Sequence, residues 1–134
     1  MSLPATEHPR NPPPKRALRI IHVDDMRELC MIVRTSLERE GHKVESFYDG
    51  ATALRRVEEN PQAYDVFISD HHMPKMNGLE VVRRLRQIDF PGKIFIFSSE
   101  IDEDVNKLYL DLHVDRVMPK PILLPELREL LAEV

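Results

Sequence analysis

The sequence predicts an α/β fold, a doubly wound five-stranded parallel sheet with five helices, and three observations lead to this prediction. Short apolar, β-branched segments alternate five times with segments whose apolar residues recur at helical spacing. Gly, Pro, Asn and Asp separate many of these segments. The run 94–97 is continuously apolar, which is typical of a strand buried on both faces. Such an alternation favours a parallel sheet with helices on both faces and right-handed crossovers.

Five segments are predicted as strands because of their apolar and β-branched composition. The second of them has mixed polarity, as expected for a strand at the edge of a sheet. In chain order the predicted strands cover residues 17–23, 43–47, 65–69, 94–97 and 114–118.

A helical pattern follows each predicted strand. The first helix is predicted over 26–40, with Gly41 as its stop. The second is predicted to begin after Asp49, which can cap it, and to end at Asn60-Pro61.

The third helix is predicted over 78–88, the fourth after an Asp102 cap, and the last from Pro125. Helical spacing places an apolar stripe on each of the five helices, and these stripes should face the sheet. The predicted inward positions are Leu29, Val33, Leu37, Ala51, Leu54, Val57, Leu79, Val82, Leu85, Val105, Leu108, Leu112, Leu127, Leu130, Leu131 and Val134.

Composition restricts the class of protein. The length of 134 residues suits one domain, and 42% hydrophobic with 31% charged residues is typical of soluble globular proteins. The net charge of −4 argues against direct binding of nucleic acid. No apolar run is long enough to span a membrane or to serve as a signal peptide. The single cysteine, Cys30, excludes an internal disulfide, so we expect a cytoplasmic protein without membrane contact.

Residues 1–16 differ in composition from the rest of the chain. They hold five of the eleven prolines, including the run 12–14. We therefore expect a flexible, Pro-rich tail over 1–16 and a folded domain over 17–134. Both recognition by a partner and a passive extension are compatible with this proline content.

Asp70 is the central candidate for chemistry. It lies where the third predicted strand ends and a turn-forming stretch with Pro74, Asn77 and Gly78 begins. In open α/β sheets, ligands bind at the carboxyl ends of the strands. A carboxylate at that edge can act as a nucleophile.

Three other predicted strands also end in polar groups. Asp24 and Asp25 follow the first strand, Ser98 follows the fourth, and Lys120 follows the fifth. The carboxyl ends of parallel strands meet at one edge, so these side chains should gather around Asp70. A carboxylate cluster without cysteine suits a hard cation such as Mg²⁺, with Mn²⁺ as the alternative.

The set D-D, D-x-x-M-P-x-M-x-G, S-[small]-E and K-P, in that order, resembles the receiver domain of bacterial response regulators. The resemblance covers about residues 17–134 and implies strand order 2-1-3-4-5 in a flavodoxin-like three-layer sandwich. It also implies that Asp70 accepts a phosphoryl group from a phosphohistidine. The donor would be a sensor histidine kinase or a phosphotransfer protein, and catalysis would be mostly positioning and charge neutralisation.

The resemblance also assigns metal ligands. Asp70 and Asp25 would bind Mg²⁺ directly, Asp24 directly or through water, and His72 through its backbone carbonyl. An alternative for Asp24 and Asp25 is capping of the first helix, where a carboxylate is favoured by the helix dipole. The two interpretations are compatible, since one residue can cap while the other binds metal.

Further roles follow from the same resemblance. Lys120 would act as a mobile point charge on a phosphoryl oxygen, and Ser98 would donate a hydrogen bond to the phosphoryl group. His72 and Glu100 stand at positions that tune the lifetime of the acyl phosphate. The Lys120-Pro121 bond is expected to be cis.

The chain departs from the family pattern at Val117, where many receivers carry an aromatic residue that moves on activation. His113 also replaces a usual small residue. His71 and His72 are neighbours in extended backbone, so their side chains should point apart and form no two-histidine metal site. We expect both to be solvent-facing neighbours of the candidate site.

The leading prediction is a phosphorylatable receiver without an output domain, which catalyses only its own phosphorylation and dephosphorylation. It would signal to a downstream protein through the fourth helix, fifth strand and fifth helix. One alternative is a receiver cut from a larger regulator or from a hybrid histidine kinase. A phosphatase of the haloacid dehalogenase type is disfavoured, because it needs a second Asp where His72 stands.

Overall fold

The computed structural model describes residues 16–100 and 102–134, so the predicted tail lies outside the described residues except for Arg16. Within these described residues the strands alternate with five α-helices and one 3₁₀ helix. In chain order the elements are β2 (Arg19–Val23), α1 (Arg27–Arg39), β3 (Lys43–Phe47), α2 (Gly50–Glu59), η1 (Pro61–Ala63), β4 (Val66–Asp70), α3 (Gly78–Gln87), β5 (Lys93–Ser98), α4 (Glu103–Asp111), β6 (Arg116–Pro119) and α5 (Leu124–Ala132).

The five strands of the described part of the chain pair in parallel, in the spatial order β3-β2-β4-β5-β6. Counted along the chain this is the order 2-1-3-4-5, so the predicted fold class is confirmed. The strand β4, which ends at Asp70, is fully buried and lies at the centre of the sheet. The sheet therefore carries the candidate acceptor between two neighbouring strands.

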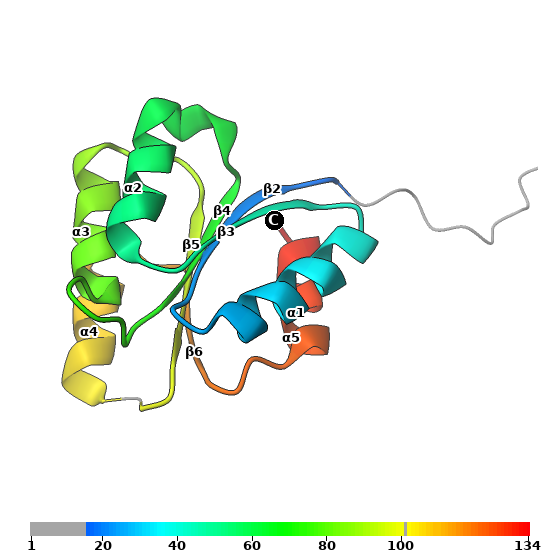
Figure 1. Ribbon diagram of the computed structural model, residues 1–134. Coiled ribbons are helices and arrows are strands. Elements are labelled where there is room, and N and C mark those ends of the chain that lie inside the picture. The colour runs from blue at the N-terminus through cyan, green and yellow to red at the C-terminus, as the bar shows by residue number, and fades with distance from the viewer. Residues whose placement is uncertain (1–15, 101) are drawn as a thin grey trace, which may run out of the picture.

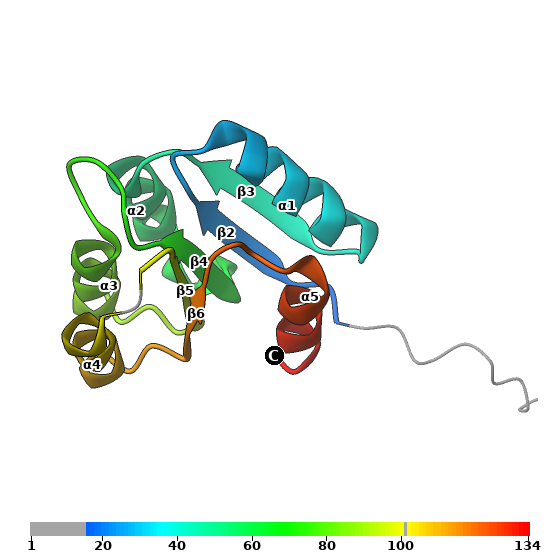
Figure 2. The same ribbon diagram turned by 90° about the horizontal axis from the view of Figure 1, so that it is seen from below.

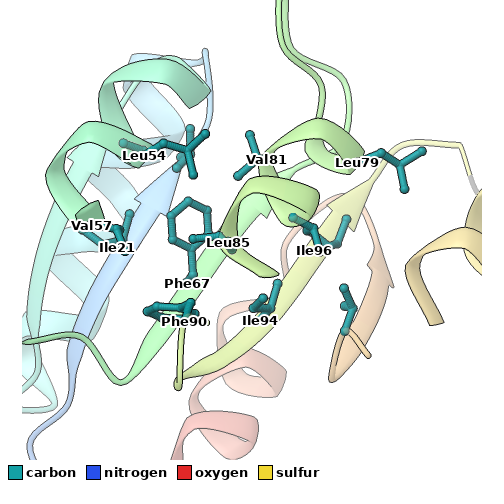
Figure 3. Close-up of a cluster of buried hydrophobic side chains, with 14 of the residues drawn as sticks. Ile21, Leu54, Val57, Phe67, Leu79, Val81, Leu85, Phe90, Ile94 and Ile96 are labelled. Carbon is teal, nitrogen blue, oxygen red and sulfur yellow. The ribbon is translucent and has the colours of Figure 1, made fainter. Parts of the chain in front are cut away.

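The helices cover both faces of the sheet. Figures 1 and 2 show α2, α3 and α4 on one side and α1 and α5 on the other. Two clusters of buried apolar side chains fill the spaces between these layers. In the first cluster, Phe67 of β4 lies between α2 and α3 residues such as Leu54 and Leu85 (Figure 3). This packing holds the carboxyl ends of the strands in fixed positions.

Capping residues set the starts of three helices. The carboxylate of Asp49 accepts a hydrogen bond from the Thr52 N–H, and that of Asp102 accepts one from the Asp104 N–H. Both predicted caps are thereby confirmed. At α3 the side chain of Asn77 accepts from the Glu80 N–H, a cap that the sequence interpretation did not assign.

The prediction that Leu108 faces inward is wrong. Its side chain is 42% exposed, whereas the neighbouring Tyr109 is fully buried. The reason is that α4 is rotated so that its largest side chain enters the space beside α3, where the phenol finds a polar partner. Apolar spacing alone ranked leucine above tyrosine and could not reveal that partner.

A polar cluster ties β3 to α2 and to the segment before β4. Arg56 donates a hydrogen bond to Glu45 Oε1 over 2.8 Å, and the Tyr64 hydroxyl donates to Glu45 Oε2 over 2.8 Å. Burial alone would raise the pKa of Glu45, but these two hydrogen bonds outweigh it and hold the pKa below its usual range. The ionised carboxylate therefore stabilises the fold.

We expect Glu45→Gln to lower the free energy of unfolding at pH 7 by about 0.5–1 kcal/mol, a modest value because the pair is partly screened by solvent. The pKa of Glu45 is lower in the folded protein than in the unfolded chain, where it is near 4.5. The stabilisation by its carboxylate is therefore fully present above that pH and is lost as the pH falls through the pKa of the folded protein. Denaturant unfolding between pH 7 and pH 3 tests this. Glu59→Gln, at an exposed carboxylate that also contacts Arg56, is the control. Equal loss in both variants would contradict the assignment.

Candidate functional site

Four strand ends meet at one edge of the sheet. Asp24 directly follows β2, Asp70 ends β4, Ser98 ends β5, and Lys120 directly follows β6. In the parallel register Asp70 lies opposite Phe97, the residue before Ser98. The predicted convergence of these groups is therefore present in the fold.

Three carboxylates form the acidic part of the site. One oxygen from each of Asp24, Asp25 and Asp70 lies within 4.8 Å of the other two. Asp24 and Asp70 are buried, and Asp25 is exposed. An all-oxygen donor set with one side open to water fits a hard divalent cation that keeps part of its hydration shell.

Lys120 is the counter-charge of this cluster. Its Nζ lies 2.7 Å from Asp24 Oδ2 and 3.2 Å from Asp70 Oδ2, and its side chain is only 15% exposed. The Lys120 N–H donates to the Ser98 carbonyl, which fixes the backbone beside β5. The Lys120-Pro121 bond is cis, as predicted. One ammonium thus lies between the two buried carboxylates.

The electrostatics of the site show an excess of negative charge. Burial is the main cause that raises the pKa of Asp70; the Asp24 charge adds to it, whereas Lys120 and a hydrogen bond from the His72 backbone oppose it. Burial would lower the pKa of Lys120, but hydrogen bonds and charges from Asp24 and Asp70 raise it above its usual value. Three carboxylates share one ammonium, so an added cation would be attracted here.

The structure does not bear out the alternative prediction that Asp24 or Asp25 caps the start of α1. The N-cap of α1 is Met26, and no side chain of the described residues caps this helix end. Asp24 Oδ1 accepts a hydrogen bond from the Met26 N–H over 2.9 Å, but Asp24 lies two positions before the N-cap residue. Its other oxygen binds Lys120, so Asp24 supports the loop and the charge cluster together.

Ser98 is buried at the edge of the site, but its hydroxyl does not face Asp70. It donates to the Glu100 carbonyl over 2.5 Å and accepts from the Glu100 N–H over 3.2 Å. The hydroxyl is thus satisfied by its own loop. Contact with a phosphoryl group on Asp70 would require this loop hydrogen bond to break.

The two histidines after Asp70 differ in environment. His72 is exposed, as predicted, but the expectation of a solvent-facing His71 is wrong. His71 is only 8% exposed, and its Nδ1 lies 2.5 Å from the Tyr109 hydroxyl. The prediction that the two side chains point apart is also wrong, because their rings meet edge to face with centroids 4.7 Å apart. The side chain of His71 points to α4 rather than to water. Only the tertiary placement of α4 supplies its partner.

Sequence reasoning also missed His22, which lies in β2 two residues before Asp24. Burial is the main cause that lowers the pKa of His22 to about 4, so the ring is neutral near pH 7. Its Nδ1 has no hydrogen-bond partner among the described residues. The sequence feature that could have indicated a special role for His22 is that it is a polar residue within the apolar run of β2.

Val117 occupies β6 and is half-buried against the core shared with α2, α3 and α4. Its small side chain offers no hydroxyl and no aromatic ring near the site. Glu100 is exposed on the loop after β5.

A parallel sheet of order 2-1-3-4-5 with an acidic cluster, a lysine and a hydroxyl at its carboxyl edge defines the receiver class of two-component signalling proteins. The sequence model of the response regulator receiver domain matches residues 20–132, and the chain belongs to this family.

Curated relatives include regulators and a sensor kinase. The chain is 32% identical over 110 residues to the transcriptional regulatory protein CutR of Streptomyces coelicolor, covering 82% of this chain and 50% of that protein. It is 34% identical over 104 residues to the alkaline phosphatase synthesis transcriptional regulatory protein PhoP of Bacillus subtilis, covering 77% and 42%. It is 28% identical over 126 residues to the autoinducer 2 sensor kinase/phosphatase LuxQ of Vibrio vulnificus, covering 90% and 14%. The chain thus spans half or less of these relatives.

Solved structures share the fold. Chemotaxis protein CheY4 of Vibrio cholerae matches with a TM-score of 0.79 at 26% identity, covering 89% of this chain and 99% of that chain. A receiver domain protein of Clostridium thermocellum matches with a TM-score of 0.81 at 24% identity, covering 87% and 92%.

Among the described residues, none of the helices is both long enough and apolar enough to span a membrane.

Replacing Asp24 and Asp25 together by Asn should weaken Mg²⁺ binding at least about tenfold, because two of the three clustered carboxylates lose their charge. Isothermal titration calorimetry measures the affinity. The variant Glu58→Asn/Glu59→Asn, which removes two exposed carboxylates from α2, controls for the change in net charge. Unchanged Mg²⁺ affinity in the first variant would remove these residues from the metal site.

Proposed function

We propose that Asp70 accepts a phosphoryl group from a phosphohistidine on a sensor histidine kinase or phosphotransfer protein. The observation that carries this proposal is the position of Asp70 at the end of the central strand, 3.2 Å from Lys120 and clustered with Asp24 and Asp25. Family membership supports the same chemistry. The relatives are longer proteins, of which this chain matches half or less, so their activities are not assigned to this chain.

The reaction is a displacement at phosphorus. An oxygen of the Asp70 carboxylate forms a bond to phosphorus, the P–N bond to the donor imidazole breaks, and the electron pair leaves with that nitrogen. The donor ring enters the reaction protonated on its other nitrogen, so the products are an acyl phosphate on Asp70 and a neutral imidazole on the donor. Because little covalent chemistry is left to the acceptor, positioning and charge neutralisation supply the catalysis.

Lys120 and Ser98 have separate tasks. The Lys120 ammonium, held between Asp24 and Asp70, neutralises negative charge on the transferred group. The Ser98 hydroxyl leaves the Glu100 carbonyl and donates to a phosphoryl oxygen once that group is attached. Burial of Asp70 limits access of water to the acyl phosphate.

A divalent cation completes the site. Asp24, Asp25, Asp70 and the backbone carbonyl of His72 would hold Mg²⁺, or alternatively Mn²⁺, and their oxygen donors fit such an ion. When bound, the ion supplies positive charge that neutralises the carboxylates and the phosphoryl oxygens.

The chain is proposed to act as a switch rather than as an enzyme on a separate substrate, and to do so in the cytoplasm. Its output would be a change in binding of a downstream protein at α4, β6 and α5.

The relatives' greater length supports the alternative that this receiver works within a larger regulator or hybrid histidine kinase. Absence of direct nucleic-acid contact stays a prediction from net charge. The haloacid dehalogenase alternative is dropped because the chain belongs to the receiver family.

Acetyl phosphate with Mg²⁺ should add one phosphoryl group to the protein, and Asp70→Asn should abolish the addition, because the amide is a poor nucleophile. Intact-mass spectrometry measures the adduct. Asp89→Asn, at an exposed aspartate on the turn after α3, is the matched control and should be phosphorylated like the parent. A full adduct on the Asp70→Asn variant would overturn the assignment of the acceptor.

His72 and Glu100 are exposed side chains next to the site, where they can shield or orient an attacking water. His72→Ala and Glu100→Ala should each change the half-life of the phosphorylated protein by more than about threefold, or roughly 0.6 kcal/mol in the barrier, without preventing phosphorylation. Loss of the adduct with time, followed by mass spectrometry, tests this. Glu103→Ala is the control. Identical decay in all four proteins would exclude both residues from this role.

A further inference from the structure

Tyr109 connects α4 to the residue that follows the candidate acceptor. Its hydroxyl lies 2.5 Å from His71 Nδ1, and the two rings are nearly perpendicular with centroids 5.4 Å apart. Tyr109 is fully buried and His71 nearly so. His71 is bonded to Asp70 through one peptide, so the link begins at the strand end that carries the site.

Both groups of this hydrogen bond are held in their neutral forms by their environments. Burial and then the negative charge of Asp70 raise the pKa of Tyr109, so the phenol keeps its proton. Burial and then the neighbouring His72 lower the pKa of His71, so the imidazole is neutral near pH 7. In the His71 tautomer with Nδ1 unprotonated, the Tyr109 hydroxyl donates and Nδ1 accepts; in the other tautomer the direction is reversed.

Gly78 leaves the space that the phenol occupies. A Cβ at this position would collide with the Tyr109 hydroxyl and would lie 3.0 Å from the Asp70 carbonyl oxygen and 3.1 Å from the His71 Cα. The Gly78 N–H also donates to the His71 carbonyl over 2.9 Å. The end of β4, the start of α3 and the last turn of α4 thus meet around one hydroxyl group.

Tyr109 is also the main anchor of α4. Among the described residues of this helix it alone is buried, whereas Leu108 and Leu110 are exposed. The residue of β6 that would otherwise offer an aromatic ring is Val117, which is half-buried and apolar. A shift of His71 would therefore reach α4 through its best-packed side chain.

We propose that the hydrogen bond between His71 and Tyr109 is the link by which phosphorylation of Asp70 changes the position of α4. The inference rests on the proposed function of Asp70. A phosphoryl group adds bulk and negative charge beside the peptide that carries His71 and close to the buried phenol. The strand end and α4 then move together, and the equilibrium between two placements of the helix is biased. His71 and Tyr109 are positioning residues in this scheme and do not touch the phosphoryl group.

The test compares the parent with Tyr109→Phe, His71→Leu, the double variant, and Tyr64→Phe as a matched control. Tyr64 is another buried tyrosine, and its hydroxyl binds Glu45 away from the site. Amide ¹H–¹⁵N shifts are recorded with Mg²⁺ before and after addition of beryllium fluoride. Intact mass after acetyl phosphate treatment is measured on every protein, and amide-shift dispersion shows that each variant is folded.

The parent and Tyr64→Phe should show shift changes both in residues 71–77 and in residues 103–111. Each single variant at the link should keep the changes in 71–77 but lose roughly half or more of those in 103–111. The double variant should lose no more than either single variant, because the two groups act as one unit. All of these proteins should take up one phosphoryl group.

The link would be overturned if Tyr109→Phe kept the full amide-shift changes in α4, or if the shift changes of the parent stopped at residue 77. Normal phosphorylation in those proteins would leave the proposed function of Asp70 standing. Additive losses in the double variant would also overturn the link, since they indicate two independent packing effects. A parent that takes up no phosphoryl group would overturn the proposed function and, with it, this inference.

Discussion

The contact of one partly buried ammonium with two buried carboxylates is the constraint on which the rest of the site depends. Asp24 and Asp70 are removed from water by the helices on both sheet faces, and such charges are costly unless they are paired. Lys120 can reach both only because β2, β4 and β6 run parallel and end at the same edge. With three carboxylates against one lysine, the site keeps a negative excess that suits a cation and, through it, a phosphoryl group.

The same architecture explains how a local event can be transmitted. The hydroxyl of Ser98 is held by its own loop, so the site before phosphorylation is not in contact with its serine. The helix α4 is tied to the end of β4 by Tyr109 and His71, around the space left at Gly78. Val117 takes no part in such a contact. In this protein the route from the site to α4 is therefore predicted to run through the strand that carries Asp70 rather than through β6.

The comparisons place these features in a modular family. Receiver domains occur in the relatives both beside transcriptional regulatory functions and within a sensor kinase, while this chain aligns with only a part of each. The shared unit is the sheet with its carboxyl-edge groups. Function in such a family depends on the residues of the site and of the helices next to it rather than on the fold alone.

The sequence alone determined the order of the elements, the starts of α2 and α4 at Asp49 and Asp102, and the convergence of the acidic and basic groups. These features depend on local periodicity, capping chemistry and the rule that parallel strands end together. Only the tertiary structure decided which side chain of α4 is buried and where His71 points. Those outcomes depend on how α4 rotates against α3, and a hydrogen bond between residues 38 positions apart leaves no local signal in the sequence.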